Sequence, residues 1–549
     1  MTTSPTPAIT LAGLSFAWPD GTTVLEDLSG TFGTGRTGLI GDNGSGKSTL
    51  LRLIAGELAP SSGTVTATGT VGHLPQNLPL RTGAAVADLL GIRTRLTALR
   101  AIEDGDCDPA RYDALGEDWD VEARSLAALS RSGLDGISLD RSVGTLSGGE
   151  AMLVALAGLR LAGDDIVLCD EPTNDLDRPA RHRLYDAVRD WPGTLLVVSH
   201  DVELLNLMDA TAELHAGALT VVGGPYDRYR EQLARDQAAA AQDLRAAEQD
   251  LRAEQRRRVE AQTALDRRRR YARTDFENRR RPKMIMKTRA QEAQVSAGKL
   301  RGRHDAAVDA AREQVAERER ALREDARITI DLPDPAVPAG RRLAELEDAD
   351  GRMILLQGPR RVALTGRNGI GKTRLLRTLV DPAPHRGVRA RPFTRRIGML
   401  PQRLDHLGED LTILESVRAS APATPVGELR ALLARLLLRG EAVDRRVGDL
   451  SGGERFRVAL AGLVLADPPH ELLVLDEPTN SLDLGSIDAL VDVLAGYRGG
   501  LLVVSHDEHF LERLGLDLRL VLDEDGLRPG TAPRPAQRRF RDRSVDSAE

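Results

Sequence analysis

The chain has 549 residues, of which 41% are hydrophobic and 29% charged, and its formal net charge is −7. This length exceeds what a single hydrophobic core accommodates, so we expect at least two folded domains, and the ordinary composition excludes a disordered chain. The negative net charge excludes a protein that coats nucleic acid with its whole surface, although it leaves room for a local basic element.

The first residues lack a basic start followed by an apolar run, so no signal peptide is expected. The best apolar runs, such as 195–198 and 501–504, contain four residues, which is too short to span a bilayer and suits buried strands. Cys107 and Cys169 are far apart and lack CxxC spacing, which disfavours a disulfide framework or a zinc site. We therefore expect a cytoplasmic protein without membrane contact.

The first motif in the chain is GDNGSGKST at residues 41–49, between a short apolar strand expected at 38–41 and a helix expected at 49–55. Its pattern is that of a phosphate loop, in which glycines let backbone N–H groups close around phosphate oxygens. Lys47 is expected to reach the β- and γ-phosphates of a nucleotide and Ser48 to bind Mg²⁺. Before the loop stands Trp18, which either stacks on adenine or belongs to the core.

Two adjacent carboxylates end the apolar strand expected at 164–170. Asp170 is placed to hold Mg²⁺ through water, and Glu171 is placed one residue further to polarise an attacking water molecule. The same pair occurs as Asp476 and Glu477 after an expected strand at 471–476, and PTN follows both pairs. A solvated Asp-Glu pair at a strand end does not explain this shared continuation.

Five motifs of the first half recur in the same order in the second half. The interval from Asp170 to His200 is 30 residues, as is the interval from Asp476 to His506. Repetition at fixed spacing indicates one supersecondary unit present twice. The repeated motifs are the phosphate loop (again at 366–374, before a helix expected at 374–379), LPQ at Leu74 and Leu400, LSGGE at Leu146 and Leu450, DEPTN at Asp170 and Asp476, and LLVVSHD at Leu195 and Leu501.

These motifs resemble those of ATP-binding cassette ATPases, whose two cassettes pair head to tail with each ATP between one phosphate loop and the other LSGGE. The resemblance implies intramolecular pairing within a monomer, bound ATP and Mg²⁺, and metal ligation that includes Gln76 and Gln402. The implied first site comprises Gly41, Asn43, Gly44, Gly46, Lys47, Ser48, Thr49, Gln76, Asp170, Glu171 and His200 with Ser451, Gly452 and Gly453. The implied second site comprises Gly366, Asn368, Gly369, Gly371, Lys372, Thr373, Gln402, Asp476, Glu477 and His506 with Ser147, Gly148 and Gly149.

The two sites are not equivalent in sequence. The second cassette has no aromatic residue in the region 347–351 that matches Trp18. Its partner LSGGE is followed by Leu153 where the family usually has a basic residue, whereas Arg457 stands at that position after the other LSGGE. We therefore expect the second site to bind or turn over ATP less well.

Residues 226–341 belong to neither cassette. The stretch 227–271 contains no Gly or Pro and predicts one long helix, and a second helix is expected at about 291–325, interrupted near Gly298 and Gly302. Between residues 267 and 303 there are 14 basic residues against three acids, a net of +11, which leaves −18 for the rest of the chain. A basic tip on an acidic body indicates a localised, phosphate-rich target rather than a merely solvated coiled coil. The candidate RNA contacts are Arg279, Arg280, Arg281, Lys283 and Lys287.

Tandem cassettes joined by a long charged helical linker resemble the ABC-F proteins, over nearly the whole chain. That resemblance implies an ATPase that binds the ribosome at the tRNA exit site and acts through its linker on the P-site tRNA and the peptidyl-transferase centre. The interval from Gln76 to Ser147 is 71 residues against 49 between Gln402 and Ser451, an excess too short for a large inserted arm. A long linker with little arm favours the antibiotic-resistance type over a housekeeping translation factor, which stays the alternative.

Two other classes fit less well. The ATPase subunit of a membrane transporter usually needs only a short connector between its cassettes, so no permease is expected. A DNA-maintenance ATPase carries its coil within a cassette, whereas here the coil lies between two uninterrupted ones. The predicted fold is α/β, with two P-loop NTPase domains joined by a helical hairpin. The predicted boundaries are 1–225 for the first cassette, 226–341 for the linker, 342–528 for the second cassette and 529–549 for a short tail.

Overall fold

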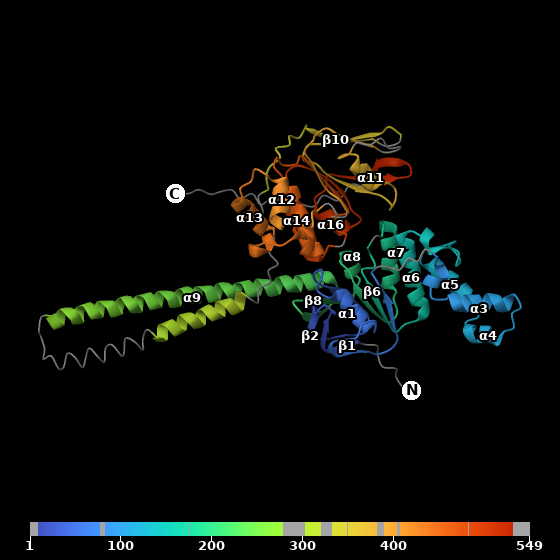
Figure 1. The fold of residues 1–549 in the computed structure, drawn as a ribbon, viewed down its shortest axis with the longest axis horizontal. Coiled ribbons are helices and arrows are strands. Elements are labelled where there is room, and N and C mark those ends of the chain that lie inside the picture. The colour runs from blue at the N-terminus through green and yellow to red at the C-terminus, as the bar shows by residue number, and fades with distance from the viewer. Residues whose placement is uncertain are drawn as a thin grey trace. The chain divides into compact units, whose positions relative to one another are not determined.

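A computed structural model of the chain describes residues 9–76, 83–174, 176–277, 302–319, 332–347, 350–381, 389–402, 404, 407–436, 438–480 and 482–530. The chain divides into two compact units (Figure 1). One unit contains both cassettes and comprises Met1–Tyr226 together with Arg327–Glu549, and the other comprises Asp227–Ala326.

The first cassette contains two sheets and a set of helices. Its strands are β1 (Ile9–Ala17), β2 (Thr23–Phe32), β3 (Arg36–Ile40), β4 (Ser62–Ala67), β5 (Val71–Leu74), β6 (Ile166–Asp170), β7 (Thr194–Val198), β8 (Ala210–His215) and β9 (Ala218–Gly223). Its helices are α1 (Lys47–Ile54), α2 (Val86–Leu89), α3 (Arg93–Glu103), α4 (Pro109–Leu115), α5 (Val121–Arg131), the 3₁₀ turn η1 (Val143–Thr145), α6 (Gly148–Ala162), α7 (Arg178–Arg189) and α8 (Val202–Leu205). The larger sheet has the order β5-β6-β7-β3-β8-β9, and the smaller antiparallel sheet has the order β2-β1-β4.

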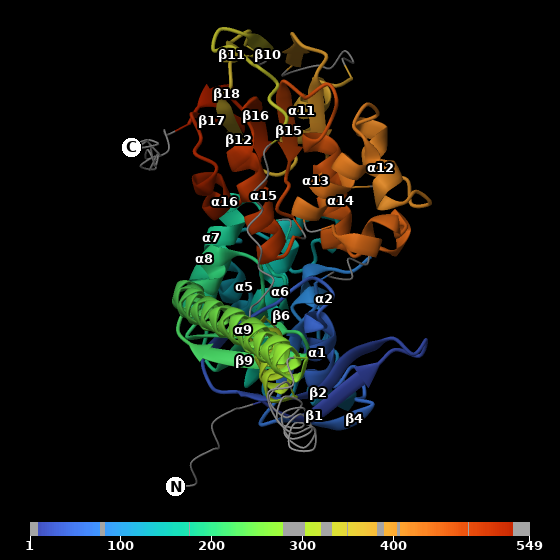
Figure 2. The same ribbon diagram turned by 90° about the vertical axis from the view of Figure 1, so that its left-hand side faces the viewer.

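The second cassette repeats this arrangement. Its strands are β10 (Arg342–Glu347), β11 (Met353–Gln357), β12 (Arg361–Thr365), β13 (Arg389–Pro392), β14 (Ile397–Leu400), β15 (Leu472–Asp476), β16 (Gly500–Val504), β17 (Leu518–Asp523) and β18 (Gly526–Pro529). Its helices are α11 (Lys372–Arg377), α12 (Ile413–Ser420), α13 (Val426–Arg435), the 3₁₀ turns η2 (Gly440–Asp444) and η3 (Val447–Asp449), α14 (Gly452–Val464), α15 (Leu484–Gly496) and α16 (Glu508–Arg513). The orders β14-β15-β16-β12-β17-β18 and β11-β10-β13 match those of the first cassette. Figure 2 labels β12 and β15 to β18 of the larger sheet.

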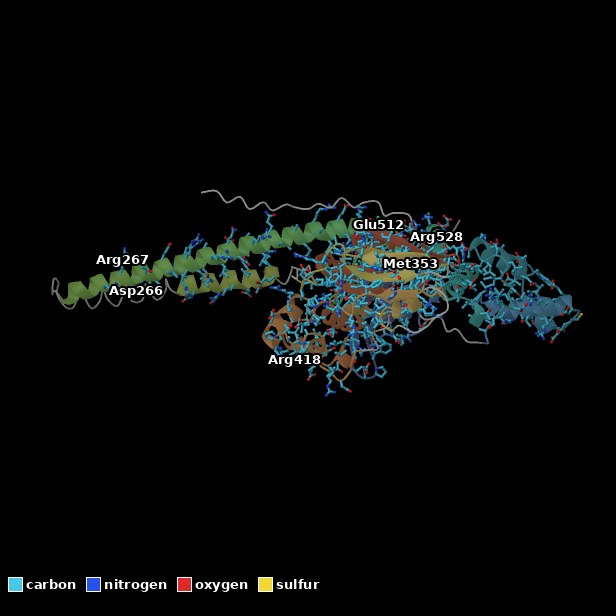
Figure 3. The ribbon with its side chains drawn as sticks, turned by 90° about the horizontal axis from the view of Figure 1, so that it is seen from above. Asp266, Arg267, Met353, Arg418, Glu512 and Arg528 are labelled. Atoms are coloured by element: carbon cyan, nitrogen blue, oxygen red, sulfur yellow. The ribbon has the colours of Figure 1, made fainter. Side chains whose placement is uncertain are left out.

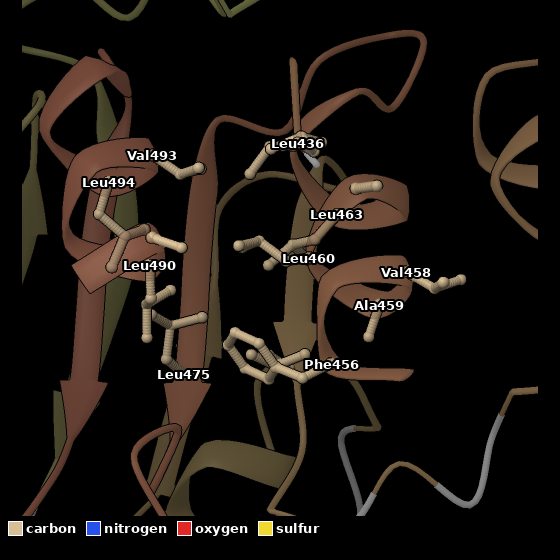
Figure 4. Close-up of a cluster of buried hydrophobic side chains, with 14 of the residues drawn as sticks. Leu436, Phe456, Val458, Ala459, Leu460, Leu463, Leu475, Leu490, Val493 and Leu494 are labelled. Atoms are coloured by element: carbon tan, nitrogen blue, oxygen red, sulfur yellow. The ribbon is translucent and has the colours of Figure 1, made fainter. Parts of the chain in front are cut away.

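The central parallel strands are buried on both faces, which explains their continuous apolar sequence. In β15, Leu472 and Val474 pack into the core beside α11, whereas Leu473 and Leu475 face the core formed by α14 and α15. Figure 4 shows Leu475 of the strand beside Leu490 of α15 and Phe456 of α14. Since side chains alternate along a strand, each strand joins two cores and holds the helices on either side of the sheet.

The motif residues lie at one edge of each large sheet. The phosphate loop follows β3 or β12, the Asp-Glu pair ends β6 or β15, and the motif histidine follows β7 or β16. These three strands are neighbours in the order β6-β7-β3 and again in the order β15-β16-β12. Because neighbouring parallel strands end at the same edge, residues distant in sequence meet there, which is the usual ligand site of such sheets. The predicted α/β fold with two P-loop NTPase domains is confirmed.

The second unit contains the long helix α9 (Tyr226–Glu277), whose 52 residues make it about 78 Å long. This confirms the predicted helix and extends it by six residues at its carboxyl end. Residues 302–319 form a second helix beside α9 (Figures 1 and 3). Ion pairs at 3.4 Å (Arg258 to Asp305) and 3.9 Å (Arg318 to Asp243) show that the two helices run antiparallel.

Figure 3 labels Arg267 on α9, where the basic run begins. The described second helix is shorter than the predicted 291–325, and the remainder of that prediction lies outside the described residues. So do the candidate RNA contacts Arg279, Arg280, Arg281, Lys283 and Lys287.

Candidate active sites

Both phosphate loops depend on glycines that other residues cannot replace. Gly46 and Gly371 precede the helices α1 and α11 with φ angles of 97° and 106°, in the left-handed region that favours glycine. A Cβ added to Gly41 would lie 2.3 Å from the carbonyl oxygen of Leu214, and the second loop has the same restriction at Gly366. The helices begin at Lys47 and Lys372, two residues earlier than predicted, because the left-handed glycine already ends each loop.

The lysine of each loop is held by backbone carbonyl groups. Lys47 Nζ donates to the oxygens of Gly41 (2.7 Å) and Asp42 (2.8 Å). Its side chain is buried, which lowers its pKa, while carboxylates led by Glu171 oppose that shift. Carbonyl groups carry no net charge, so they hold the buried ammonium group without neutralising it. Its positive charge can therefore still attract an anion.

Lys372 has an additional partner in the second cassette. Its Nζ donates to Gly366 O (2.7 Å) and Arg367 O (3.1 Å), and it lies 2.9 Å from His506 Nε2. Burial lowers the pKa of His506 to about 3, so the imidazole is neutral and its Nε2 accepts from the lysine. A phosphate arriving at this loop has to displace that contact.

The strand-end aspartates fit a Mg²⁺ site. Among the described residues, Oδ1 of Asp170 and both carboxylate oxygens of Asp476 are buried without a hydrogen-bond partner. Burial raises the pKa of both groups, and the hydroxyls of Ser48 and Thr373 oppose that rise. Buried carboxylate oxygens beside a hydroxyl are the hard oxygen donors that Mg²⁺ prefers.

The two glutamates share an unusual backbone conformation. Glu171 and Glu477 have φ angles of 48° and 47°, which non-glycine residues rarely adopt. Their N–H groups donate to Val198 O (2.9 Å) and Val504 O (2.8 Å), which fixes them against the neighbouring strand. Strain stored at the same position in both cassettes marks a functional residue, and nothing in the residue type reveals it.

Each glutamate lies next to the motif histidine of its own cassette. Oε1 of Glu171 is 3.2 Å from His200 Nε2, and the corresponding distance between Glu477 and His506 is 3.3 Å. Burial lowers the pKa of His200 to about 3, so both histidines are neutral. Burial also raises the pKa of Glu171 to about 8 and that of Glu477 to about 7. Without a bound cation Glu171 therefore keeps its proton at neutral pH, whereas Glu477 releases its proton close to neutral pH.

This burial predicts a pH-dependent stability. Between the ordinary value of 4.5 and the raised pKa of about 7, folded Glu477 holds a proton that the unfolded chain has released. The free energy of unfolding therefore falls as pH rises through this interval, and the permanently neutral Glu477→Gln does not follow it. We expect the gain in Tm of Glu477→Gln over wild type to be larger at about pH 8.5 than at about pH 5, by on the order of 2 °C for roughly 2 kcal/mol in a chain of 549 residues.

The measurement is thermal unfolding of the nucleotide-free protein at the two pH values. Glu122→Gln is the matched control, because Glu122 is a half-exposed carboxylate paired with Arg100 at 2.7 Å. A Tm difference for Glu477→Gln that is the same at both pH values would contradict the burial argument.

Each LSGGE motif begins a helix, α6 or α14. Ser147 caps α6 with its Oγ accepting from Glu150 N (3.2 Å), and Glu150 Oε2 accepts in return from Ser147 N (2.8 Å). Ser451 and Glu454 form the same reciprocal cap on α14. The S-x-x-E spacing could have identified both glutamates from sequence. Such a helix start presents free N–H groups suited to a phosphate.

Contacts between the cassettes place the segment after DEPTN of one beside the phosphate loop of the other. Asn43 N donates to Asp483 Oδ2 at 3.0 Å, and the same aspartate caps α15 through Ser486 N. The pairing of residues 451–453 with the first loop, and of 147–149 with the second, stays a prediction.

A cavity of about 570 Å³ is lined by most of the second-cassette residues predicted for the second site, but not by Gly366 or by Ser147, Gly148 and Gly149 of the first cassette. It also includes residues that the sequence reasoning did not select. Its lining contains Asn368, Gly369, Gly371, Lys372, Thr373, Gln402, Asp476, Glu477 and His506, together with Arg374, Arg377, Asn480 and, from the first cassette, Leu176 and Arg181.

Three residues distinguish the two sites in sequence, and the structure shows what each of them contacts: Trp18, Leu153 and Arg457. Trp18 directly follows β1 and packs edge-on against Phe16 with ring centres 5.0 Å apart. The Arg52 guanidinium, in the last turn of α1, lies 6.0 Å from the centre of this half-buried ring. Leu153 is buried in the core of the first cassette, whereas the half-buried Arg457 donates to Gly453 O at 3.4 Å. Because position 153 lies in the core, it holds an apolar residue in place of the basic residue that usually follows LSGGE.

In the described part of the chain, no helix is long and apolar enough to cross a membrane. A family model described as ABC transporter matches residues 25–174 and 355–480. The tylosin resistance ATP-binding protein TlrC of Streptomyces fradiae is 35% identical over 93% of this chain and 97% of its own length. ATP-binding cassette sub-family F member 3 of Pongo abelii is 30% identical over 87% of this chain and 66% of its own.

The solved structures support the same fold. The complex of archaeal ribosomal stalk protein aP1 with archaeal ribosome recycling factor aABCE1 matches with a TM-score of 0.54 and 19% identity, covering 93% of this chain and 87% of that chain. At this identity the match concerns the fold alone. The family model covers the phosphate loop and the DEPTN motif of both cassettes, and relatives match along nearly the whole chain. The chain therefore belongs to the ABC-F family of tandem ATP-binding cassette ATPases.

Proposed function

We propose that this ATPase binds the ribosome in its ATP-bound state, at the tRNA exit site, and acts through residues 226–341 on the P-site tRNA and the peptidyl-transferase centre. We further propose that it protects ribosomes from an antibiotic. The observation that carries the proposal is the second unit, in which a 52-residue helix leads from the first cassette into a run of one-signed charge. A localised basic segment in an otherwise acidic chain favours phosphate-rich RNA as the partner.

The two cassettes bind and hydrolyse ATP and thereby control whether the protein is in its ribosome-binding state. Lys47 and Lys372 bind the phosphates of ATP, and Asp170 and Asp476 would hold Mg²⁺, which would supply positive charge beside those phosphates. Glu171 and Glu477 then orient and deprotonate the attacking water, while the neutral histidines beside them hold the terminal phosphate. ATP bound between the cassettes stabilises their closed pairing, and hydrolysis removes the contacts that the terminal phosphate makes with both cassettes.

The antibiotic role has separate support. TlrC, at 35% identity over nearly the whole of both chains, is named for tylosin resistance. Tylosin is therefore the first drug to test, by expression of this chain in a sensitive host and by translation assays with purified ribosomes. A housekeeping role in translation is the alternative, and it predicts a growth defect without drug when the gene is removed.

The first experiment is co-sedimentation of the Glu171→Gln/Glu477→Gln variant with purified ribosomes. We expect it to pellet with ribosomes in ATP and to stay in the supernatant in ADP, because the variant keeps ATP bound and the cassettes closed. Replacing Arg279, Arg280 and Arg281 with Glu in that variant should weaken binding by at least about tenfold and flatten its salt dependence.

The matched control replaces three arginines outside the basic run with Glu. Arg228, Arg235 and Arg245 lie at the start of α9, outside the basic run, and their reversal should leave pelleting within about twofold of the parent if the run itself binds RNA. A parent variant that binds ATP normally and yet stays in the supernatant would contradict ribosome binding and redirect the search to membrane or DNA partners.

A further inference from the structure

Arg181 of the first cassette lies in the wall of the second ATP site. It belongs to the first turn of α7, four residues after the Asp177 that caps this helix. The cavity that it lines also contains Lys372, Glu477 and His506 of the second cassette. None of the sequence motifs includes Arg181, and its place at this site follows from how the two cassettes pair.

The Arg181 guanidinium is fixed on one side by its own cassette. Its Nε donates to Leu176 O at 3.3 Å, and its Nη1 donates to Asp201 Oδ2 at 3.3 Å. Asp201 is held in turn by the Tyr185 hydroxyl at 2.6 Å and by the N–H of Leu204. Among the described residues, the other terminal nitrogen, Nη2, has no hydrogen-bond partner. The side chain is 12% exposed, and it lines both the cavity of the second site and a second, smaller cavity beside Asp507 and Glu508.

The charge of Arg181 reaches the catalytic pair of the other cassette. Burial raises the pKa of Glu477, and the positive charges of Lys372 and then Arg181 oppose that rise. For His506, burial lowers the pKa, and the same two cations lower it further. Arg181 is therefore close enough to act electrostatically on the residues expected around the terminal phosphate.

The second cassette has an apolar residue at the position that matches Arg181. The residue eleven positions after Asp476 is Ile487, as Arg181 is eleven positions after Asp170. Ile487 is 5% exposed and packs in the core of the second cassette. This arginine therefore belongs to one site of the two.

We propose that Arg181 is a trans-acting residue of the second ATP site, whose free Nη2 binds the terminal phosphate of a nucleoside triphosphate held by the second phosphate loop. A guanidinium suits a phosphate oxygen, and a fixed one loses little freedom on binding. The contact makes the first cassette distinguish ATP from ADP at the second site and fastens the two cassettes together there. This inference rests on the proposed assignment of Lys372 and its neighbours as an ATP site.

The test compares ATP and ADP affinities of the full chain carrying Lys47→Ala, which silences the first site, and Glu477→Gln, which prevents hydrolysis. Adding Arg181→Ile, the residue found at the matching position of the second cassette, should raise the Kd for ATP between about tenfold and about a hundredfold and leave the Kd for ADP within about twofold. Arg181→Lys keeps the charge and should recover part of the ATP affinity. Equilibrium dialysis with labelled nucleotide gives both constants.

Two controls separate the possible failures. Asp201→Asn removes the ion pair but keeps an oxygen that can cap α8, so a loss of ATP selectivity in Arg181→Ile that is absent in Asp201→Asn reflects the phosphate contact. Lys372→Ala tests the site itself: if it leaves ATP binding unchanged, the site assignment is wrong. If Lys372→Ala abolishes binding while Arg181→Ile and Arg181→Lys both keep the wild-type ratio of ATP to ADP affinity, the role of Arg181 is wrong.

Discussion

Replacing Glu171 and Glu477 together with Gln is expected to lower kcat for ATP hydrolysis at least about a hundredfold while changing ATP affinity no more than about threefold. Each carboxyl group is 9% exposed and lies within 3.3 Å of a neutral histidine, so water that reaches it is confined. Gln keeps the size and the hydrogen-bond acceptor but cannot take a proton. Because burial raises the pKa of both glutamates toward or above neutral pH, the neutral amide disturbs the nucleotide-free site little.

The single variants apportion the activity between the sites. We expect Glu171→Gln to cause the larger loss, since Trp18 and the arginine-bearing LSGGE helix are both predicted to belong to the first site. Steady-state phosphate release measures kcat, and equilibrium dialysis measures affinity. Glu122→Gln makes the same chemical change at a half-exposed ion pair and should leave both unchanged. A double variant that retained more than about a tenth of wild-type activity would mean that another group activates the water.

The sequence predicted the architecture well because its motifs are spaced by the sheet itself. In both cassettes the phosphate loop, the Asp-Glu pair and the histidine each follow one of three adjacent parallel strands. The motifs therefore identify those three strands as neighbours in the sheet. The helix over residues 227–271 was equally predictable, because no Gly or Pro interrupts it. Its extension to Glu277 passes beyond Tyr271 into residues that also suit a helix.

Other features depend on contacts that no local pattern encodes. The left-handed conformation of Glu171 and Glu477 is imposed by the neighbouring strand, whose carbonyl accepts their N–H, and glutamate itself does not favour it. Arg181 is one of many arginines on exposed helices, and only the pairing of the cassettes places it at the second site. Likewise, the contact of Lys372 with His506 has a physical cause in burial, which leaves the imidazole neutral.

Lys47→Ala is expected to raise the Kd of the first site for ATP more than about a hundredfold, and Lys372→Ala to do the same at the second site, so that each variant binds one ATP per chain instead of two. A buried ammonium facing phosphate supplies a charge-assisted hydrogen bond that Ala cannot replace. Its loss also leaves carboxylates, led by Glu171 beside Lys47 and by Glu477 beside Lys372, without their nearest cation. Lys299→Ala, a change in the linker, should leave both sites unaffected.

The ATP affinity that remains in each single-lysine variant is that of its unmutated site. The two variants therefore compare the two sites directly. At the second site, Lys372 must give up its 2.9 Å contact with His506 before it can bind phosphate, whereas Lys47 Nζ, within the described residues, donates only to two carbonyl oxygens of its own loop. The second site also has no counterpart to Trp18, and base stacking on an aromatic ring contributes about 1–3 kcal/mol. The ATP site that survives in Lys47→Ala should therefore be weaker than the one that survives in Lys372→Ala, by about tenfold or more. Equal constants would mean that Arg181 fully offsets these losses at the second site, and Arg181→Ile in the Lys47→Ala chain would then expose the difference.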